Sequence, residues 1–285
     1  MNMFIDWAPD VVALGLGFFA IRWYSLCWIL GLMGVTFLMH RLYRQQNLTD
    51  EQFEPMFMYC FVGILVGARL GHCLFYEPEY YLHHITEMLL PIKALPDGGW
   101  RFTGYEGLAS HGGTIGLMVA LVLYARSQRL PLLHVLDNVG IVTPVCACAI
   151  RLGNLMNSEI IGKVSDVPWA FRFMHSSEAM QTLDASGMPL PRHPGQLYEA
   201  ICYAAFFFVG WFMYRRRGGL VGSGFFFGLC LFLIFTSRIF IEYTKENQVS
   251  FEDGMLFNMG QLLSLPFVLL GAFCMYRALA NARRK

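Results

Sequence analysis

Charged residues are scarce in this sequence. Only 14% of its 285 residues are Asp, Glu, Lys or Arg, whereas 56% are hydrophobic and the mean hydropathy is +0.46. A soluble globular domain carries about 25% charged residues, so the composition indicates a chain built for lipid. The net charge is +1 and no basic stripe runs along the sequence, which argues against a nucleic acid partner.

Several motifs that would identify a chemistry are also missing. The eight cysteines lie in apolar runs without CxxC spacing, which favours buried hydrophobic side chains over zinc or redox ligands. No set of His, Cys and carboxylate residues has ligand spacing, so we expect no metal and no cofactor. The lack of a GxSxG motif disfavours a serine lipase. The last apolar run, 256–277, lacks the lysine that a retinal protein needs.

Seven apolar stretches are long enough to cross a bilayer, which takes about 20 residues in a helix. We predict spans at 23–42, 55–77, 107–125, 132–151, 195–214, 219–241 and 256–277. The stretch 11–21 is also apolar, but Gly15 and Gly17 interrupt it, and we interpret it as an interfacial segment. The sequence therefore predicts an all-α integral membrane protein in which residues 1–285 form a single seven-helix domain.

Basic residues concentrate after alternate predicted spans. They are Arg41 and Arg44, Arg126 and Arg129, Arg215 to Arg217, and Arg283 to Lys285. Because short basic loops face the cytoplasm, seven spans place the N-terminus outside and the C-terminus inside. The stretch 152–194 then faces outward, and its length predicts a small head formed by loops.

Polar side chains recur near the outer ends of six predicted spans. They are Tyr24, Arg69, His111, Arg151, His193, Tyr198, Arg238 and Glu242. Ionisable residues inside spans are costly and usually functional. Three arginines at one depth indicate an anion site, and lipid phosphate is the commonest anion at that depth. A planar guanidinium holds phosphate oxygens in pairs and stays charged in lipid.

Taken singly, most of these residues have a structural explanation. Arg69 could extend to the headgroups as an anchor. Arg238 and Glu242 are four residues apart on one helix face and could neutralise each other. A lone His111 is more often a hydrogen-bonded core residue than a catalyst. The functional interpretation therefore depends on their common depth.

The densest concentration of polar groups lies in residues 151–162. Arg151 is followed within nine residues by Asn154, Asn157 and Glu159. Amides can orient a phosphate ester or a peptide backbone through paired donors and acceptors. Helix capping would explain one asparagine but not the whole set.

This segment resembles the signature of the prolipoprotein diacylglyceryl transferase family, Gly-Arg-x-Gly-Asn-apolar-apolar-Asn-x-Glu-x-x-Gly. The chain matches it from Arg151 to Gly162 and departs from it at Ile150, where the family has glycine, a change that we expect to alter helix packing rather than chemistry. Further similarities follow the family's order along the chain. They are Trp23-Tyr24, Gly67 to Gly71, Ser110 to Gly113, Pro191 to Glu199, Arg238 to Glu242 and Met259 to Gln261. Some members carry a tyrosine where this chain has Ile234, so a role of that tyrosine does not transfer.

The resemblance implies a multi-pass enzyme of the bacterial plasma (inner) membrane. Its N-terminus, its active site and a small head at about 152–194 would be periplasmic, and its C-terminus cytoplasmic. The implied reaction transfers the diacylglyceryl group of phosphatidylglycerol to the lipobox cysteine thiol of a prolipoprotein, the first step of lipoprotein maturation. The products would be a thioether and glycerol 1-phosphate. The implied partners are phosphatidylglycerol, preprolipoprotein signal peptides and the lipid bilayer.

Individual roles follow from this resemblance and from side-chain chemistry. Arg151 and Arg238 are expected to hold the phosphate, His111 to act as a base or positioning group for the thiol, and Tyr24 to complete the pocket. The predicted catalytic residues are His111, Arg151, Arg238 and Tyr24. The predicted phosphatidylglycerol-binding residues are Arg69, Arg151, Asn154, Asn157, Glu159, Gly162, His193, Tyr198, Arg238 and Glu242.

A transporter of an anionic or lipid-like substrate is the alternative function, because polar residues in membrane helices also line permeation paths. Transport sites usually lie near the bilayer midplane on broken helices, whereas the polar residues of this sequence cluster toward one face. This difference favours an enzyme.

Overall fold

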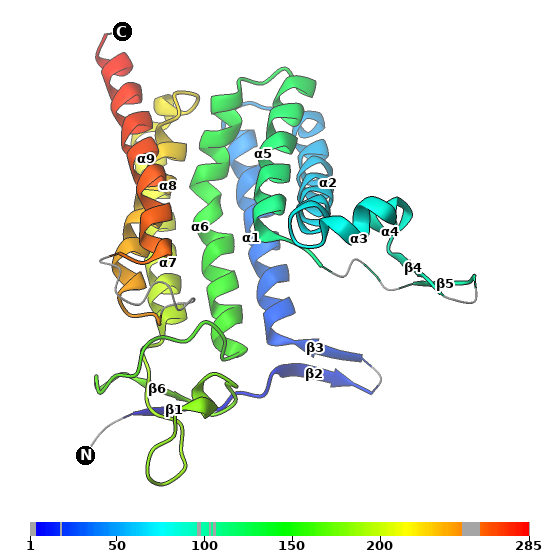
Figure 1. The fold of residues 1–285 in the computed structure, drawn as a ribbon. Helices are drawn as coiled ribbons and strands as arrows, with labels where there is room; N and C mark the ends of the chain where they lie inside the picture. The colour runs from blue at the N-terminus through cyan, green and yellow to red at the C-terminus, as the bar shows by residue number, and fades with distance from the viewer. Residues whose placement is uncertain are drawn as a thin grey trace. The chain divides into compact units, whose positions relative to one another are not determined.

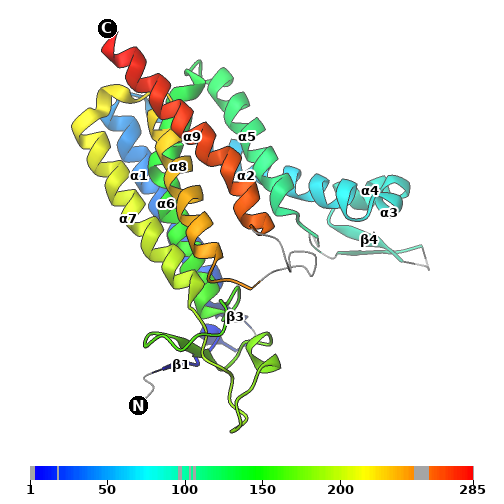
Figure 2. The same ribbon diagram turned by 60° about the vertical axis from the view of Figure 1, so that its left-hand side comes forward.

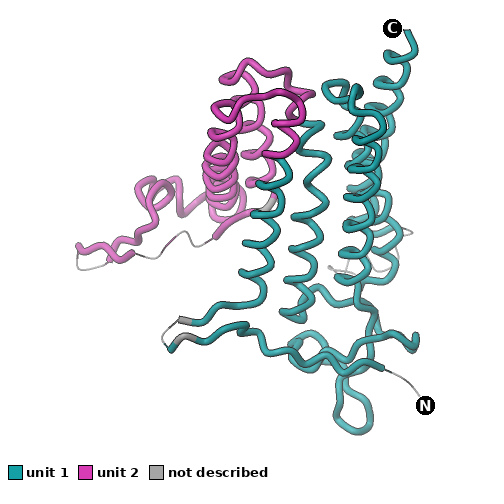
Figure 3. The backbone as a smooth tube through the Cα atoms, turned by 180° about the vertical axis from the view of Figure 1, so that it is seen from behind, with its two compact units in different colours: residues 1–39, 136–285 teal, residues 40–135 magenta. Residues whose placement is uncertain are grey.

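The computed structural model describes residues 4–17, 19–95, 98–102, 104, 107–246 and 257–284. Its contacts divide the chain into two compact units, shown in Figure 3. Unit 1 comprises residues 1–39 and 136–285, and unit 2 comprises residues 40–135. The chain passes from one unit to the other within helix α1 (Trp23–Gln45) and again within helix α6 (Leu132–Met156).

Unit 1 is a bundle of long helices with short strands at one end. Besides most of α1 and α6, it contains helices α7 (Gly195–Arg217), α8 (Phe225–Glu242) and α9 (Met259–Arg283), strands β1 (Ile5–Trp7), β2 (Val12–Leu16), β3 (Phe19–Arg22) and β6 (Phe171–Phe173), and the 3-10 turns η1 (Ala179–Gln181) and η2 (Gly218–Leu220). In Figures 1 and 2 these strands lie at one end of the helices, and the end of α9 lies at the other.

Six helical segments in the described part of the chain are long and apolar enough to cross a membrane. They are Trp23–Gln45, Asp50–Phe75, Leu132–Met156, Gly195–Leu220, Phe225–Glu242 and Met259–Arg283. The prediction of a mainly helical membrane protein is confirmed at this level. The predicted span 107–125 is a helix, α5 (Ser110–Ser127), but not one of the six, because a polar first turn and Arg126 dilute its apolar sequence. Seven spans and their orientation stay predictions, and residue 256 of the last predicted span lies outside the described residues.

Several helix boundaries differ from the predicted ones, by up to six residues at the start of α8 (225 against 219) and at the end of α9 (283 against 277). The span placed at 219–241 begins at Phe225, because a turn in which Gly222 and Gly224 have φ angles of 89° and 86° precedes it. Glycine adopts such angles without steric cost. The buried carboxylate of Asp137 accepts the backbone N–H groups of both glycines at 2.9 Å. Asp137 therefore holds the turn and supplies acceptors at the beginning of α8.

Glycines allow the helices of unit 1 to approach closely. A Cβ atom added to Gly31 of α1 would lie 2.7 Å from the Ala149 Cβ of α6. A Cβ atom on Gly228 of α8 would lie 2.7 Å from the carbonyl oxygen of Gly271 in α9. Such small-residue contacts are typical of helices packed in lipid, where van der Waals contact replaces the hydrophobic effect.

The predicted head at 152–194 folds around its own apolar core and recruits the N-terminal strand. Strand β1 pairs in parallel with β6, with Trp7 opposite Phe173, and the Trp7 indole N–H donates to the Leu155 carbonyl at 2.9 Å. The buried core consists of Leu155, Ile161, Phe171, Phe173 and Ala179. The participation of β1 was not predicted. The predicted interfacial segment 11–21 forms most of the antiparallel hairpin of β2 and β3.

Unit 2 is built on two long helices that contact each other through glycine residues. It contains α2 (Asp50–Phe75), α3 (Pro78–His83), α4 (Ile85–Leu89), β4 (Ile92–Ala94), β5 (Trp100–Phe102) and α5. A Cβ atom on Gly71 of α2 would lie 2.7 Å from the Gly112 Cα of α5, and one on Gly63 would lie 2.7 Å from the Gly116 carbonyl oxygen. The four-residue spacing of glycine in α2 thus forms a continuous contact face.

We expect Gly67→Ala to destabilise the protein. The added Cβ would lie 2.7 Å from the Gly116 Cα, so α2 and α5 must separate, at a cost of about 1–3 kcal/mol in the free energy of unfolding. Gly210→Ala is the matched control, because nothing lies within 4 Å of a Cβ there. Thermal unfolding in detergent should show a lower midpoint for Gly67→Ala only. Equal midpoints for the two variants would contradict the packing argument.

Candidate functional site

The site is centred on Arg151, in the last turns of α6. Its Nε atom lies 2.7 Å from Glu199 Oε2 of α7, and its Nη1 atom lies 3.5 Å from Asn154 Oδ1, one helical turn further along α6. Glu199 is fully buried. A carboxylate excluded from water needs a close cation, so Arg151 and Glu199 depend on each other.

The chain turns back sharply after α6 and returns Glu159 to the helix end. Asn154 Nδ2 donates to Glu159 Oε1 at 2.7 Å, and Asn157 Nδ2 approaches the same oxygen at 3.5 Å. Ser158 and Ile160 have φ angles of 53° and 59°. A β-branched residue such as isoleucine rarely adopts this region, and such strain persists where the surrounding structure requires it. The predicted set from residues 151–159 is therefore one hydrogen-bonded network.

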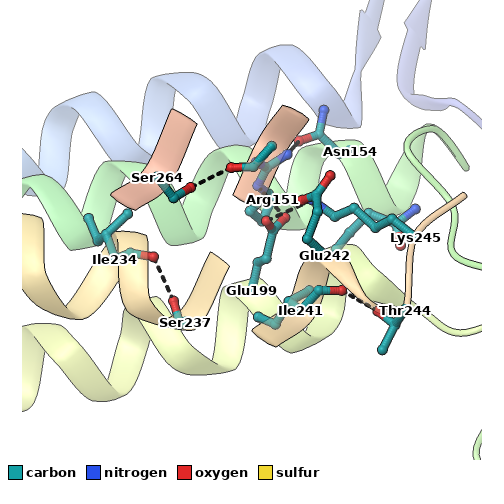
Figure 4. Close-up of polar contacts among 12 residues, drawn as sticks. Arg151, Asn154, Glu199, Ile234, Ser237, Ile241, Glu242, Thr244, Lys245 and Ser264 are labelled. Atoms are coloured by element: carbon teal, nitrogen blue, oxygen red, sulfur yellow. Dashed lines mark hydrogen bonds and ion pairs between the residues drawn. The ribbon is translucent and has the colours of Figure 1, made fainter. Parts of the chain in front are cut away.

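A buried lysine extends this network to α8. Lys245 Nζ lies 3.0 Å from Glu199 Oε1 and 3.3 Å from Glu242 Oε2. Figure 4 shows Arg151 and Glu199 close to Glu242 and Lys245. We call Arg151, Asn154, Glu159, Glu199, Glu242 and Lys245 the polar cluster. Glu199 and Lys245 are not among the site residues predicted from the sequence, although Glu199 ends one of the segments that carry the resemblance.

Gly162 lies where the head returns to the helices. Its N–H donates to the His193 carbonyl oxygen at 3.0 Å, and a Cβ atom there would lie 2.6 Å from that oxygen. The His193 Nδ1 atom lies 3.0 Å from the Tyr198 hydroxyl, which accepts the Trp169 indole N–H at 2.8 Å. Burial lowers the pKa of the His193 imidazole, so this side chain is neutral at pH 7. Gly162, His193 and Tyr198 are thus linked where the head meets α7.

Arg238 and Tyr24 complete the predicted residues of unit 1. Among the described residues, Arg238 Nε is buried and has no hydrogen-bond partner. Glu242, four residues beyond Arg238, instead approaches Lys245. The Tyr24 ring packs on Gly153, where a Cβ atom would lie 3.0 Å from Tyr24 Cδ2.

Two predicted site residues belong to unit 2. The Arg69 side chain is buried and donates to the backbone carbonyls of Glu87 at 2.6 Å and Met88 at 3.2 Å. His111 lies in the first turn of α5. Arg69 therefore holds α4 against α2. The prediction that Arg69 and His111 share a site with Arg151 joins residues of both units and stays a prediction.

The polar cluster offers charge-assisted hydrogen bonds. In the described ranges, no three His, Cys, Asp or Glu side chains are placed to hold a metal ion. Guanidinium and amide donors suit recognition of a phosphate ester, because charge-assisted hydrogen bonds strengthen where water is excluded. The buried carboxylates hold these donors in place.

Comparison with known proteins gives one consistent result. Residues 11–277 match the family described as prolipoprotein diacylglyceryl transferase. The chain is 52% identical over 272 residues to the phosphatidylglycerol–prolipoprotein diacylglyceryl transferase of Bacteroides fragilis, covering 95% of this chain and 94% of that protein. It is 40% identical over 285 residues to the Porphyromonas gingivalis protein of the same name, covering 98% and 96%. The Tolumonas auensis protein of that name is 41% identical over 280 residues, with 98% of each chain covered.

Proposed function

Because this chain belongs to the prolipoprotein diacylglyceryl transferase family, we propose that its polar cluster binds phosphatidylglycerol for diacylglyceryl transfer to prolipoproteins. The chain is a membrane transferase of lipoprotein biosynthesis. The observation that carries this function is 52% identity over 95% of the chain. The acceptor is the thiol of the lipobox cysteine in a preprolipoprotein signal peptide.

The reaction exchanges one bond for another at the glycerol backbone of the lipid. The cysteine sulfur forms a bond to the diacylglyceryl carbon that carries the phosphate, and the carbon–oxygen bond to the phosphate breaks. The thiol proton passes to a base, and glycerol 1-phosphate leaves with one additional negative charge. The site must therefore bind a phosphate diester and stabilise the growing charge on its oxygens.

Arg151 and Arg238 are the groups suited to that phosphate. Glu199 holds the Nε side of the Arg151 guanidinium at 2.7 Å, and in this proposal the Nη side binds the phosphate oxygens. The buried Nε of Arg238 needs an acceptor that the described residues do not supply, and a lipid phosphate satisfies it. Asn154 and Glu159 hold the end of α6 in place. Tyr24, packed on Gly153, closes this side of the pocket.

The remaining predicted contacts concern the rest of the headgroup and the head. Glu242 belongs to the polar cluster and Asn157 contacts it, whereas Gly162, His193 and Tyr198 lie where the head meets α7. We propose that they contact the glycerol headgroup of phosphatidylglycerol. We propose a role in binding the same lipid for Arg69 as well.

The direct test of this function is product chemistry. Membranes containing the protein are incubated with phosphatidylglycerol labelled in its acyl chains and with a peptide carrying a lipobox cysteine. A labelled thioether on the peptide and release of glycerol 1-phosphate are expected. Movement of intact phosphatidylglycerol without peptide labelling would favour the transporter alternative.

We expect His111→Gln to reduce transfer by about 100-fold or more, because general-base catalysis contributes about 10²–10⁴-fold. A cysteine thiol has a pKa of about 8.5, so at neutral pH it needs a base or a positive field to become a thiolate. Initial rates across pH 6–9 check the assignment. Raised pH should partly restore the variant's rate, whereas nearly full activity with an unchanged pH profile would remove His111 as the base.

We place the head on the periplasmic side of the bacterial plasma membrane and the C-terminus in the cytoplasm, in one seven-span domain. Ala185 is exposed in the head, and Gly219 is exposed after α7 at the opposite end of that helix. A membrane-impermeant thiol reagent applied to intact cells should label Ala185→Cys and not Gly219→Cys. The unsubstituted protein measures the background from its eight cysteines. The reverse labelling pattern would invert this orientation.

A further inference from the structure

Lys245 is a buried cation just beyond the end of α8. Its side chain is 8% exposed, and its Nζ lies between Glu199 Oε1 at 3.0 Å and Glu242 Oε2 at 3.3 Å. Lysine is almost never buried unless it is paired with an opposite charge. The two carboxylates are themselves 0% and 5% exposed. One ammonium therefore lies between two buried carboxylates, and Arg151, beside Glu199, supplies the second positive charge.

Backbone hydrogen bonds fix the main chain around Lys245. Lys245 forms an antiparallel bridge with Gly162, and the Thr244 carbonyl accepts the Lys163 N–H at 2.7 Å. The aliphatic stem of Lys245 runs past Gly195, where an added Cβ atom would lie 3.9 Å from its Cγ and Cε. These contacts give the side chain one direction, toward the polar cluster.

Glu199 transmits the position of Lys245 to Arg151. One oxygen of its carboxylate contacts Lys245 Nζ, and the other lies 2.7 Å from Arg151 Nε. A carboxylate held at both oxygens cannot rotate, so it presents a fixed edge to the guanidinium. Without the ammonium, the carboxylates of Glu199 and Glu242 would repel each other. Arg151 would then be the only close cation left to Glu199, so the Glu199 carboxylate and the Arg151 guanidinium would rotate together.

Glu242 is held in turn by α9. Its carboxylate lies against Gly260, where a Cβ atom would approach Glu242 Cδ and Oε1 to 2.8 Å. Gln261 donates to the Ile239 carbonyl of α8 at 3.0 Å. The successive contacts from Arg151 through Glu199 and Lys245 to Glu242 therefore connect α6 with α7, with the chain after α8, and with α9.

We propose that Lys245 is a positioning residue that fixes Glu199 and thereby aims the Arg151 guanidinium at the phosphate of phosphatidylglycerol. This inference rests on the proposed role of Arg151 in binding that lipid. Lys245 itself does not touch the reacting atoms. Its effect on the reaction passes through Arg151.

The first experiment compares Lys245→Met with Lys245→Arg in the labelled-lipid transfer assay. Lys245→Met removes the ammonium and should lower kcat/KM by about 10- to 100-fold, the usual cost of displacing a positioned group by about 1 Å. Lys245→Arg keeps a cation between the carboxylates and should recover most of that loss. Lys163→Met is the matched control, because Lys163 is exposed, and it should leave the rate unchanged.

The second experiment is a double-mutant cycle on lipid binding, with Kd for phosphatidylglycerol measured on protein in nanodiscs of a zwitterionic lipid. Lys245→Met should weaken binding by about tenfold when Arg151 is present and by less than about twofold in an Arg151→Ala background, since the two residues act as one unit. Equal losses in both backgrounds, or no loss with Arg151 present, would overturn the inference. If Arg151→Ala itself left binding and transfer unchanged, the proposed site would fail instead.

A double variant tests the inference if Lys245→Met does not fold. Lys245→Met leaves two buried carboxylates with one fewer cation, and removing one partner of a buried pair destabilises proteins strongly. Lys245→Met/Glu242→Gln keeps the net charge and leaves the Arg151–Glu199 pair in place. If the single variant does not fold, this double variant should still show the loss of kcat/KM when it is compared with Glu242→Gln alone. Wild-type activity in a folded double variant would overturn the inference.

Discussion

Replacing Arg151 with alanine is expected to lower diacylglyceryl transfer by at least about 1,000-fold. Removing one preorganised donor for a developing negative charge costs about 10²–10³ in rate. Arg151 has a second role as the partner of a buried charge, because its Nε lies 2.7 Å from the fully buried Glu199. Its removal leaves that carboxylate with Lys245 as its remaining close cation and changes the field across the site. The measurement is the initial rate of labelled-lipid transfer to a lipobox peptide in detergent.

Two variants separate the binding role of Arg151 from a general loss of charge. Arg151→Lys keeps a cation beside Glu199 but lacks the planar fork, and a fork and a point charge are not equivalent at a phosphate, so we expect an intermediate rate. Arg172→Ala removes another arginine paired with a carboxylate, at 3.4 Å from Asp184 in the head, and should retain activity. Wild-type transfer by folded Arg151→Ala would refute the phosphate role.

The second large effect is expected for Arg238→Ala, with a rate loss of about 100- to 1,000-fold. Within the described chain, the Arg238 Nε is buried without an acceptor. An unsatisfied buried donor costs about 1–3 kcal/mol, and a bound phosphate removes that cost. Arg238→Ala should therefore reduce transfer without lowering the unfolding midpoint. This combination distinguishes a ligand-binding arginine from a structural one.

Controls for Arg238 lie on the same helix. Ser237→Ala removes a neighbouring hydroxyl that donates to the Ile234 carbonyl at 2.9 Å and should leave the rate unchanged. Isothermal titration calorimetry should show a weaker affinity for phosphatidylglycerol in Arg238→Ala and an unchanged affinity in Ser237→Ala. A clear fall in stability with unchanged lipid affinity would assign Arg238 a structural role.

The glycine spacing and the long apolar runs predicted most of the helical fold. A membrane span must be apolar along about 20 residues, and this requirement is local enough to read from sequence. The start of α8 could not be predicted, because it depends on Asp137 accepting N–H groups from a turn more than 80 residues away. The pairing of β1 with β6 depends equally on distant segments. Such contacts leave no periodic signal.

The sequence by itself determined the membrane class, the family resemblance and the identity of the signature segment from Arg151 to Gly162. These follow from composition, run length and residue order. Only the tertiary structure decided how the charges pair. Glu242, which is four residues from Arg238 in sequence, lies beside Lys245, and Glu199 joins Arg151 to Lys245. The physical reason is burial, because a charge removed from water must meet a close partner. That partner comes from whichever helix the packing brings near.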